Sequence, residues 1–537
     1  MKRHSFLQAL LPACVALTAC STPDPTNPGV GNGGAVGTGG VVTGGSVSAG
    51  AATGGASVAA GGVSSGGSAT GGIVGTGGVA TGGTSTGGAI TGGTSTGGTT
   101  TGGTSTGGAA TSGGGANGGA STGGTSTAGG GAGAGGKGSG GSVGTGGSAG
   151  SAGATSSAED EGADCQVAAL PAAASLPAIA KLPDPFKKLD GTVLSSKAEW
   201  RCRRQEIKRQ AELYAYGAKP GKPESVTGTV SSASITVKVS DKGKSTTFSA
   251  SVSLPGTGTG PYPAIVVLAS AGFGAPLDSA VLKSEGVATI TYDPYAVGKE
   301  TGARSPKQGA FYDIVGSNST TGLLVAWAWG VSRIIDVIEQ SGGTILKPSI
   351  GVTGCSRFGK GAFAVGVFDQ RIALTMPIES GSAGVPIWRG IPGEGAQSLS
   401  SAYGEQPWFG DAFGTFTSKP TSLPIDTHEL VAMVAPRGLF IMDNPHIANL
   451  GPKSASVAAL AGAEVYKALG AGDAITYYSD VQEGGHCAQR PEWSTPLRNS
   501  IRKFLTKTGG DAGVIKVSSK ASGNLTEWRD WTTPTLN

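Results

Sequence analysis

The chain has 537 residues, of which 98 are glycine, and a formal net charge of +4 at pH 7. Its lysines and arginines form no concentrated basic run, so we expect no nucleic-acid partner. Most glycines precede residue 160, so a domain count based on length alone does not apply.

The first twenty residues have the pattern of an export signal. Basic residues precede an apolar run over residues 6–19, which is too short for a stable transmembrane helix. The run ends in "LTAC", which resembles the lipobox of bacterial lipoproteins, so we expect residues 1–20 to be a lipoprotein-type signal and Cys20 to be lipidated. Plain cleavage after a small residue is the alternative. The two routes predict an outer-membrane or cell-surface lipoprotein and a secreted protein, respectively.

Residues 21–158 form a low-complexity segment in which "TGG", "STGG" and "TAGG" recur irregularly. Such a composition has no apolar face to offset an ordering entropy of about 1–2 kcal/mol per residue, so we expect a disordered tether. The irregular spacing and the scarcity of proline argue against a collagen-like element. An alternative is that the tether is adhesive and the following domain only caps it.

Residues 159–537 have the composition of one folded domain, which we expect to be monomeric. Its cysteines are even in number, which in an exported protein predicts two disulfides among Cys165, Cys202, Cys355 and Cys487. Buried free thiols are the alternative. No His/Cys spacing typical of a metal site occurs, and we expect no metal or cofactor.

The domain begins with an antiparallel pattern and then changes. Residues 234–255 alternate apolar and polar side chains about a turn at 241–243, which predicts a hairpin at the edge of a sheet. Residues 263–270 and 287–293 are continuous apolar runs separated by a helix-sized segment. Such runs are typical of buried parallel strands.

Strands and helices then alternate. A long helix is expected over 320–343 and another over 454–470, with strands over 349–355, 372–379, 438–444 and 474–480. This order predicts an α/β fold with a mostly parallel central sheet, helices on both faces and an antiparallel N-terminal edge. Functional residues of such sheets gather at the carboxyl ends of the strands.

Ser356, in "GVTGCSRFGKGA", lies where a strand turns sharply into a helix. This placement is typical of the nucleophile elbow of α/β-hydrolases. The usual G-x-S-x-G pattern is incomplete, because Phe358 stands at the second glycine position and Gly359 follows it. Taken alone, the stretch is a weak signal for a nucleophile, and a buried strand that runs into a helix is the alternative.

A serine nucleophile needs a base, for which histidine is the ordinary choice. His4 belongs to the signal, and His428 begins a predicted helix, where we expect a structural role. His446 follows a strand and stays a candidate. His486, in "QEGGHCAQRP", follows the last strand, the position in chain order at which α/β-hydrolases carry their base. We therefore expect His486 to be the base.

The cysteines add a geometric constraint. Cys355 directly precedes Ser356, and Cys487 directly follows His486. A disulfide requires Cα atoms within about 4.4–6.8 Å. If these two cysteines pair, the serine and the histidine must be neighbours, and Cys165 would then pair with Cys202 to clamp the N-terminal segment.

The imidazole needs a carboxylate to orient it. Glu379 ends the strand at 372–379, the next strand after the proposed nucleophile. Asp443 ends the next strand along the chain, which is the more usual α/β-hydrolase position. We favour Glu379, partly because the chain resembles a known family.

"GCSRFGKGA" matches the G-C-S-R-x-G-K-x-A signature of glucuronoyl esterases, carbohydrate esterase family 15. "AWAWGVSRIID", "PIESGSAG", "APRGL" and "GGHC" also resemble that family, over roughly residues 165–505. The resemblance implies an α/β-hydrolase fold and a carboxylic ester hydrolase. Its substrate would be the ester that joins 4-O-methyl-glucuronic acid of glucuronoxylan to alcohols of lignin.

The resemblance also implies roles for single residues. Ser356 would be the nucleophile, His486 the base and Glu379 the acid, and Arg357 would stabilise the oxyanion through its side chain and backbone N–H. Sugar hydroxyls would be bound by Lys360, Gln397 and Glu405. At a substrate-binding position where the family usually has tryptophan, "NLGPK" carries Asn449, which predicts altered sugar affinity.

Two other functions stay open. An acetyl or feruloyl esterase acting on plant polysaccharide would bring the sugar in as the alcohol, and Lys360, Gln397 and Glu405 would then have no hydroxyl-bearing acyl group to hold. A non-catalytic carbohydrate-binding surface lipoprotein would not need Ser356, His486 and Glu379 together.

Overall fold

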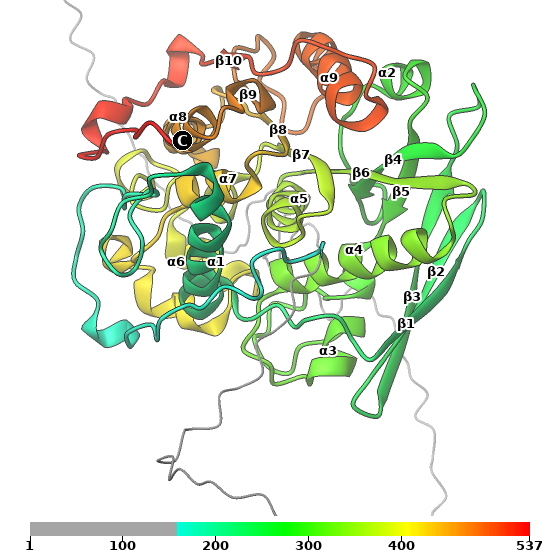
Figure 1. Cartoon of the computed structure of the whole chain (residues 1–537), viewed down its shortest axis with the longest axis horizontal. Helices are drawn as coiled ribbons and strands as arrows, with labels where there is room; N and C mark the ends of the chain where they lie inside the picture. Colours follow the sequence, from blue (N-terminus) through cyan, green and yellow to red (C-terminus); the bar gives the residue numbers. More distant parts are fainter. Residues whose placement is uncertain (1–157) are drawn as a thin grey trace, which may run out of the picture. The chain divides into compact units, whose positions relative to one another are not determined.

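The computed structural model describes residues 158–537 (Figure 1). The expected signal over 1–20, lipidation at Cys20 and the tether up to residue 157 lie outside the described residues. Within residues 158–537, no helix combines the length and apolarity needed to cross a membrane.

The described residues form one ten-stranded sheet with the order β1-β2-β3-β5-β4-β6-β7-β8-β9-β10. In this order, every pair of neighbouring strands from β5 and β4 through to β9 and β10 is parallel. The pairs β1–β2, β2–β3 and β3–β5 are antiparallel. The predicted α/β fold class with an antiparallel N-terminal edge is confirmed. The strands are β1 Ser225–Val230, β2 Ser234–Asp241, β3 Lys244–Ser253, β4 Tyr262–Leu268, β5 Ala288–Tyr292, β6 Leu346–Cys355, β7 Ile372–Ile378, β8 Gly438–Met442, β9 Ile475–Tyr478 and β10 Ile515–Lys516.

The predicted hairpin is formed by β2 and β3. Asp241 pairs with Lys244, and Lys242 and Gly243 between them both have positive φ, as the tight turns of right-twisted hairpins require. The expectation that this hairpin is the edge of the sheet is wrong, because β1 pairs on the outside of β2. Mostly exposed, β1 has too few apolar residues for a strand pattern to be visible in the sequence.

Helices cover the sheet on both faces. On one face α5 packs between α4 and α7, and on the other α9 lies beside α2 (Figure 1). The α4 helix is buried along almost its whole length, because its apolar residues continue around the helix. The helices are α1 Trp200–Ala211, α2 Ser279–Ser284, α3 Ala310–Val315, α4 Leu323–Gln340, α5 Arg357–Phe368, α6 Leu399–Glu405, α7 Thr427–Val434, α8 Pro452–Ala468 and α9 Ser494–Ile501.

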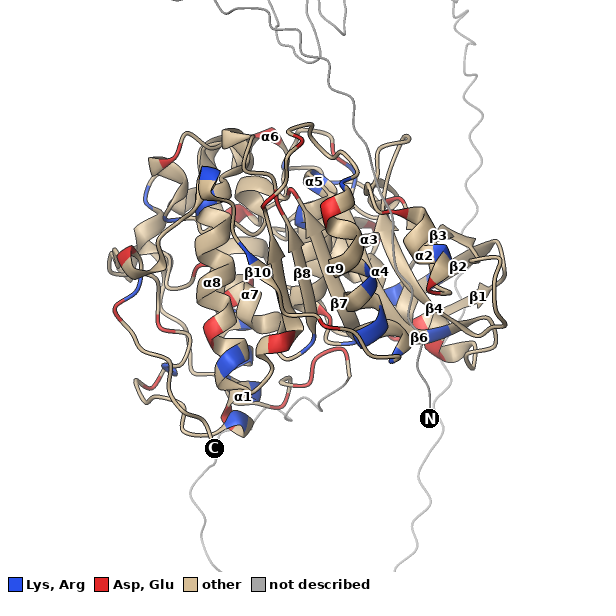
Figure 2. Ribbon diagram, turned by 90° about the horizontal axis from the view of Figure 1, so that it is seen from above, with Lys and Arg blue, Asp and Glu red and all other residues tan. Residues whose placement is uncertain are grey.

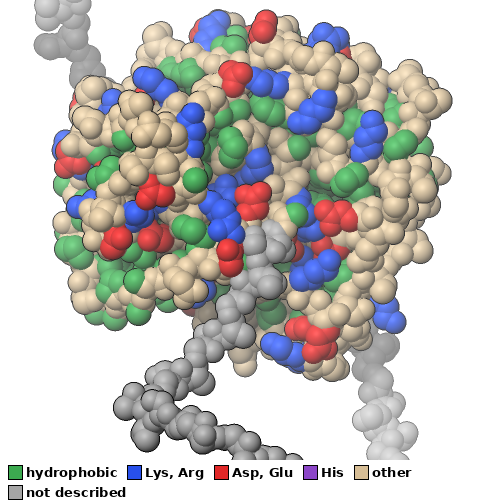
Figure 3. Space-filling view, viewed as in Figure 1, with side chains coloured by type: hydrophobic (Ala, Val, Ile, Leu, Met, Phe, Trp, Pro, Cys, Tyr) green, Lys and Arg blue, Asp and Glu red, His purple; other side chains and the backbone are tan. Residues whose placement is uncertain are grey.

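Charged residues of both signs are spread over the domain. Figure 2 shows acidic and basic positions distributed along the ribbon, and Figure 3 shows blue and red side chains interspersed with apolar ones on one face. On that face no extended region of a single sign is present.

A buried carboxylate fixes the start of the described chain. Glu159 accepts a hydrogen bond from Nη2 of Arg333 at 2.5 Å and pairs with the ammonium of Lys219, both of which are themselves buried. Burial alone would raise the pKa of Glu159, but these two cations and Arg371 hold it below its ordinary value. A few residues later, the predicted Cys165–Cys202 disulfide joins this segment to α1 and is confirmed.

The last residues pack against the N-terminal segment. Trp531 is buried and donates from Nε1 to the carbonyl of Leu182 at 3.1 Å. Asn537 exchanges backbone hydrogen bonds with Ser195 and Lys197. Residues 518–537, whose packing the sequence leaves undecided, are therefore part of the domain.

We expect Glu159→Ala to lower the free energy of unfolding by about 3–5 kcal/mol, because it leaves Arg333 and Lys219 buried without their shared partner. All eight tryptophans lie within the described residues, so denaturant unfolding of the full chain can be followed by their fluorescence. Asp473→Ala is the control. It removes an ion pair whose carboxylate is 69% exposed, and it should cost about 1 kcal/mol or less. Equal costs for the two variants would contradict a structural role for Glu159.

Candidate active site

Ser356 lies at the junction of β6 and α5 with φ +58°, a left-handed conformation that serine rarely adopts. Its N–H donates to the carbonyl of Ile378 on β7 at 3.0 Å, and its carbonyl accepts from the N–H of Lys360 in α5 at 3.0 Å. The turn is thus held from both sides. Its strained geometry is that of a nucleophile elbow, and the hydroxyl is not used to cap α5.

The two glycines near Ser356 are required by close backbone packing. A Cβ added to Gly354 would lie 2.3 Å from the carbonyl oxygen of Phe358, and one added to Gly359 would lie 2.4 Å from that of Ile378. The second glycine is therefore needed at position 359. The side chain of Phe358 instead points into the core, where the centre of its ring lies 6.0 Å from the centre of the Trp327 ring.

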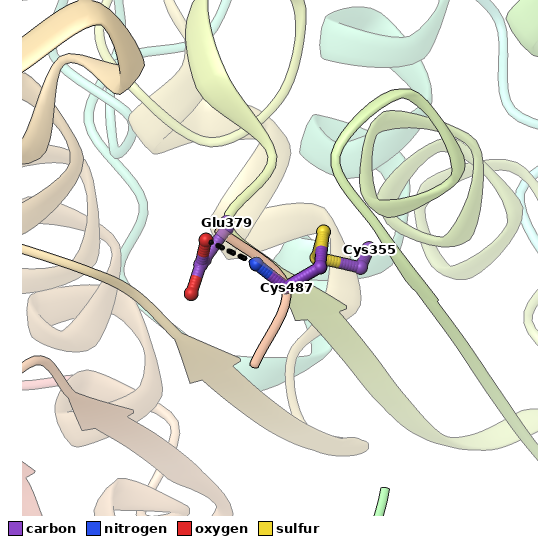
Figure 4. A group of neighbouring side chains, drawn as sticks. All are labelled: Cys355, Glu379 and Cys487. Atoms are coloured by element: carbon purple, nitrogen blue, oxygen red, sulfur yellow. Dashed lines mark hydrogen bonds between the residues drawn. A yellow bond between two sulfur atoms is a disulfide. The ribbon is translucent and has the colours of Figure 1, made fainter. Parts of the chain in front are cut away.

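His486 and Glu379 form the central hydrogen bond of the site, with Nδ1 and Oε2 separated by 2.7 Å. The Glu379 side chain is fully buried, whereas 40% of the His486 side chain is exposed. Three further donors reach the carboxylate: the N–H of Cys487 at 3.0 Å (Figure 4), Nη2 of Arg490 at 2.8 Å and Nδ2 of Asn444 at 3.4 Å. Glu379 itself has φ +45°, and its N–H donates to the carbonyl of Met442 on β8.

These donors keep Glu379 ionised. Burial alone would raise the pKa of Glu379, but the hydrogen bonds from His486, from the Cys487 N–H and from Arg490 outweigh it and hold the pKa below its ordinary value. A fixed, ionised carboxylate on Nδ1 sets the orientation of the ring, turns Nε2 into the acceptor and stabilises the imidazolium form.

The predicted Cys355–Cys487 disulfide is confirmed, with Cα atoms 5.9 Å apart. It joins the residue before Ser356 to the residue after His486, so the two backbones are held as neighbours. Cys487 has φ +57°, the third left-handed non-glycine residue in this small region. Within residues 158–537 no hydrogen bond joins Ser356 to His486, a contact that catalytic sites often complete only with substrate bound.

Cys355, Glu379 and Cys487 place possible metal-ligand atoms within 4.8 Å of one another (Figure 4). Both sulfurs belong to the disulfide, and the carboxylate is hydrogen-bonded to His486 and Arg490. The chemistry of this group is therefore that of a covalent clamp rather than of a metal centre.

The other carboxylate considered as the acid has different partners. Asp443 accepts from the hydroxyl of Tyr477 at 3.1 Å and from the N–H of Asn444 at 3.0 Å, while the carboxylate on His486 is that of Glu379. Burial, together with repulsion from Glu379, raises the pKa of Asp443 to about 7.

The remaining histidines are bonded to backbone carbonyls. His428 is fully buried in α7, and its Nε2 lies 2.8 Å from the oxygen of Pro183. Nε2 of His446 lies 2.9 Å from the oxygen of Val481. Among the described histidines, His486 alone combines a carboxylate partner with the link to Ser356.

The guanidinium of Arg357 is held by a carboxylate that the sequence did not reveal. Nη1 of Arg357 donates to Glu300 at 2.6 Å, and Glu300 also accepts from the hydroxyl of Tyr295 at 2.8 Å and from Nε1 of Trp408 at 2.6 Å. Burial works to lower the pKa of Arg357, but attraction to Glu300 raises it overall. The cation is therefore permanent and fixed beside the elbow.

Lys360 follows one turn later in α5. Its Nζ donates to the carbonyl of Ser380 at 2.6 Å and lies 5.0 Å from the centre of the Trp408 ring. Burial lowers the pKa of Lys360 to about 8, an effect that Glu405 partly opposes. Its ammonium thus loses its charge at a pH well below that of an exposed lysine.

The other predicted sugar-binding residues lie close to Arg357. Glu405 pairs with Nη2 of Arg357 at 3.4 Å and accepts from Nε2 of Gln397 at 2.8 Å. Asn449 is exposed, and its carbonyl accepts from the N–H of Gln397 at 3.0 Å. The structure therefore connects these residues into one polar group beside Ser356.

Three residues of the site were missed by sequence reasoning: Glu300, Trp408 and Arg490. Trp408 stands three residues after Glu405 in "YGEQPWF", and Arg490 stands four residues after His486. Glu300 follows the carboxyl end of β5, and charged residues in that position are candidates for a site at the edge of the sheet.

Comparison with known proteins places this geometry in a family. The model of the family "Glucuronyl esterase, fungi" matches residues 237–470. The 4-O-methyl-glucuronoyl methylesterase of Hypocrea jecorina is 37% identical over 360 residues, which are 66% of this chain and 76% of that protein. The enzyme of the same name from Thermothelomyces thermophilus is 40% identical, over 65% of this chain and 86% of its own. The chain belongs to the glucuronoyl esterase family.

Solved glucuronoyl esterase structures agree. The catalytic domain from Hypocrea jecorina superimposes with a TM-score of 0.63 at 36% identity, covering 68% of this chain and all of that one. A mutant glucuronoyl esterase from Sporotrichum thermophile, in complex with methyl 4-O-methyl-β-D-glucopyranuronate, gives 0.62 at 37% identity, over 70% of this chain and 100% of its own. The resemblance seen in the sequence is thus confirmed, and this glucuronoyl esterase family member is a carboxylic ester hydrolase.

We expect the double variant Cys355→Ala/Cys487→Ala to lose about 10²-fold in kcat on a glucuronate ester, because misplacement of reacting groups by about 1 Å costs that much. Cys165→Ala/Cys202→Ala is the matched control: it should lower thermal stability and leave kcat unchanged. Steady-state kinetics and thermal unfolding of both variants make the comparison. An unchanged kcat in the first variant would show that the clamp does not position the site.

Arg490→Met should move the acid limb of the kcat/KM profile to higher pH, because the lost cation lets the pKa of Glu379 rise toward its ordinary value. Since the pKa of Glu379 is lowered in the folded protein, its ionised form is available at acidic pH and is lost only as the pH falls through that lowered value. Arg490→Lys keeps the charge and should stay near the parent profile. Identical acid limbs in all three proteins would rule out control of Glu379 by Arg490.

Proposed function

We propose that the chain is a serine esterase that cleaves the ester between (4-O-methyl-)glucuronic acid of glucuronoxylan and alcohols of lignin. The observation that carries this proposal is the Glu379–His486 hydrogen bond, which the Cys355–Cys487 disulfide holds beside Ser356 in a member of the glucuronoyl esterase family. The names of the relatives and the bound methyl glucuronate of the Sporotrichum thermophile structure support the same substrate class.

Catalysis begins with the proton of Ser356. His486 accepts it at Nε2 while Glu379 stabilises the imidazolium through Nδ1, and the serine oxygen attacks the carbonyl carbon of the uronate ester. The oxyanion forms at the N-terminus of α5, where the Arg357 N–H has no partner within its helix and the guanidinium lies close. Collapse of the intermediate breaks the ester bond.

The second half of the reaction reverses these roles. His486 gives its proton to the departing alcohol, and a glucuronoyl ester remains on Ser356. Water then attacks this ester while His486 again takes a proton, and glucuronic acid leaves as Ser356 regains its hydrogen from His486, the acid then losing its carboxyl proton to water. Atoms and charges balance without any group beyond water.

The sugar of such a substrate lies on the acyl side of the ester, so it must be held beside Ser356 itself. Lys360, Gln397 and Glu405 offer an ammonium, an amide and a carboxylate for its hydroxyls. Asn449 offers an amide where an aromatic ring would stack on the sugar, so we expect weaker binding of the ring than a tryptophan would give.

We further propose that residues 1–20 are a lipoprotein-type signal with lipidation at Cys20, that 21–158 are a tether and that 159–537 are the catalytic domain. The protein would then be exported as a monomer and held at the outer membrane or cell surface, or be secreted where plain cleavage occurs. The support is the sequence pattern, together with the burial of Glu159 at the start of the domain.

The test is ester hydrolysis by the purified chain on benzyl glucuronate and on acetylated xylan. We expect cleavage of the glucuronate ester and a loss of about 10³-fold or more in kcat for Ser356→Ala. Deacetylation without glucuronate cleavage would favour the acetyl esterase instead. Xylan binding without hydrolysis of either ester would favour a non-catalytic binding protein.

A further inference from the structure

The loop that carries His486 contains no helix or strand. Residues 479–490 lie between β9 and the short helix that begins at Pro491, and none of them belongs to a regular element. Two glycines precede the histidine directly, and glycine does little to restrict its own backbone. A misplacement of about 1 Å in a catalytic group can cost about 10²-fold in rate. Groups outside this loop must therefore fix its backbone.

Three consecutive carbonyl groups of the loop accept hydrogen bonds from two buried side chains. Arg490 donates to the carbonyls of Glu483 and Gly485. Nδ2 of Asn444 donates to the carbonyls of Gly484 at 3.2 Å and Gly485 at 3.5 Å. Asn444 follows β8 and is fully buried. Within residues 158–537 it is the only donor to the Gly484 carbonyl.

The same amide reaches the carboxylate that orients His486. Nδ2 of Asn444 lies 3.4 Å from Oε1 of Glu379. The two N–H bonds of this amide are thus shared among three oxygens at 3.2–3.5 Å, in a place where the burial of Asn444 excludes competing water. Asn444 therefore connects the backbone before the histidine with the anion bonded to its ring.

The neighbours of Asn444 determine which end of its amide faces the loop. Oδ1 accepts from the N–H of His446 at 3.0 Å, two residues later, as in an Asx turn. Reversing the amide would place Oδ1 against three acceptor oxygens and would aim the NH2 group at a donor. The amide nitrogen therefore faces Glu379 and the loop. A neutral side chain with both a donor and an acceptor is needed at this position.

We infer that Asn444 is a positioning residue of this esterase. Its amide holds residues 483–485 and Glu379 together, and so fixes the direction in which the ring of His486 points. This inference rests on the proposed function, because it takes His486 to be the base and Glu379 its partner. Among the described residues, Asn444 has no hydrogen bond to the three proposed sugar-binding residues. It should therefore affect the chemical steps and leave the affinity for the sugar unchanged.

Kinetics on benzyl glucuronate test the inference. Asn444→Leu keeps the size of the side chain and removes its hydrogen bonds, so it should lower kcat about tenfold or more while KM stays within about threefold of the parent value. Asn444→Asp, in its ionised form, keeps the oxygen that accepts from His446 and lacks the amide donor, so it should lose at least as much kcat. Retention of the parent kcat by either variant would overturn the inference.

Tyr466→Phe is the matched control. Tyr466 is fully buried and its hydroxyl donates to the carbonyl of Arg437 at 3.0 Å. Arg437 precedes β8, whereas Asn444 follows it. Both substitutions thus remove a buried hydrogen bond to a backbone carbonyl, at opposite ends of one strand. Tyr466→Phe should lower thermal stability and keep the parent kcat, and a loss of kcat equal to that of Asn444→Leu would contradict a specific role for Asn444.

Hydrogen exchange separates this inference from the proposed function. The N–H of Cys487 donates to Glu379 (Figure 4), so its exchange reports on the loop whether or not an ester is cleaved. Mass spectrometry of the full chain follows a peptide that spans residues 482–488. We expect its exchange to be about tenfold faster in Asn444→Leu than in the parent and in Tyr466→Phe.

The two measurements have separate outcomes. Faster exchange in Asn444→Leu supports the inference even when the parent cleaves no glucuronate ester, a result that would refute the proposed function alone. Equal exchange in the parent, Asn444→Leu and Tyr466→Phe overturns the inference even when the parent is an active esterase. Thermal unfolding verifies that each variant is folded, and Asn444→Asp replaces Asn444→Leu in both measurements where the latter fails to fold.

Discussion

The site depends on one buried carboxylate. Glu379 has no access to water, and its two oxygens accept from a histidine ring, a backbone N–H, an arginine and an asparagine amide. Burying a charge without partners costs much free energy. Each of these donors is therefore held in a fixed position by its hydrogen bond to the carboxylate. The ring of His486, the backbone at Cys487 and, through the disulfide, the backbone beside Ser356 are consequently positioned around a single anion.

The same principle operates a second time at Arg357, the residue that follows Ser356. There Glu300 gathers a tyrosine hydroxyl, an indole N–H and the guanidinium of Arg357. One carboxylate therefore orients His486, the proposed base, and another orients Arg357, the cation that we propose stabilises the oxyanion. Both are in place before any substrate arrives, so little reorganisation is needed as charge moves during the reaction.

The sequence predicts those parts of the structure that depend on a periodic pattern or on residues adjacent in the chain. Alternating strands and helices gave the parallel sheet, and the cysteines next to Ser356 and His486 gave the disulfide that joins them. Glu300 and Arg490 could not be found in this way, because their roles are pairings across the fold: Glu300 lies 57 positions from Arg357, and Arg490 lies 111 positions from Glu379. No periodicity records such a partnership. Strand β1 escaped for a related reason, since its hydrogen bonds to β2, rather than its own apolar pattern, make it a strand.

The packing of the last segment of the domain against its first segment affects the order in which the domain can fold. The indole N–H of Trp531 donates to the carbonyl of Leu182, which lies 349 positions earlier in the chain. This hydrogen bond therefore cannot form until almost the whole domain has been synthesised. Contacts of such long range are entropically costly to close and form late. Leu182 is made early in the synthesis of this domain, so its carbonyl accepts from the indole of Trp531 only after the last part of the domain has followed. One of the contacts that complete the domain would then form at the segment with which the domain begins.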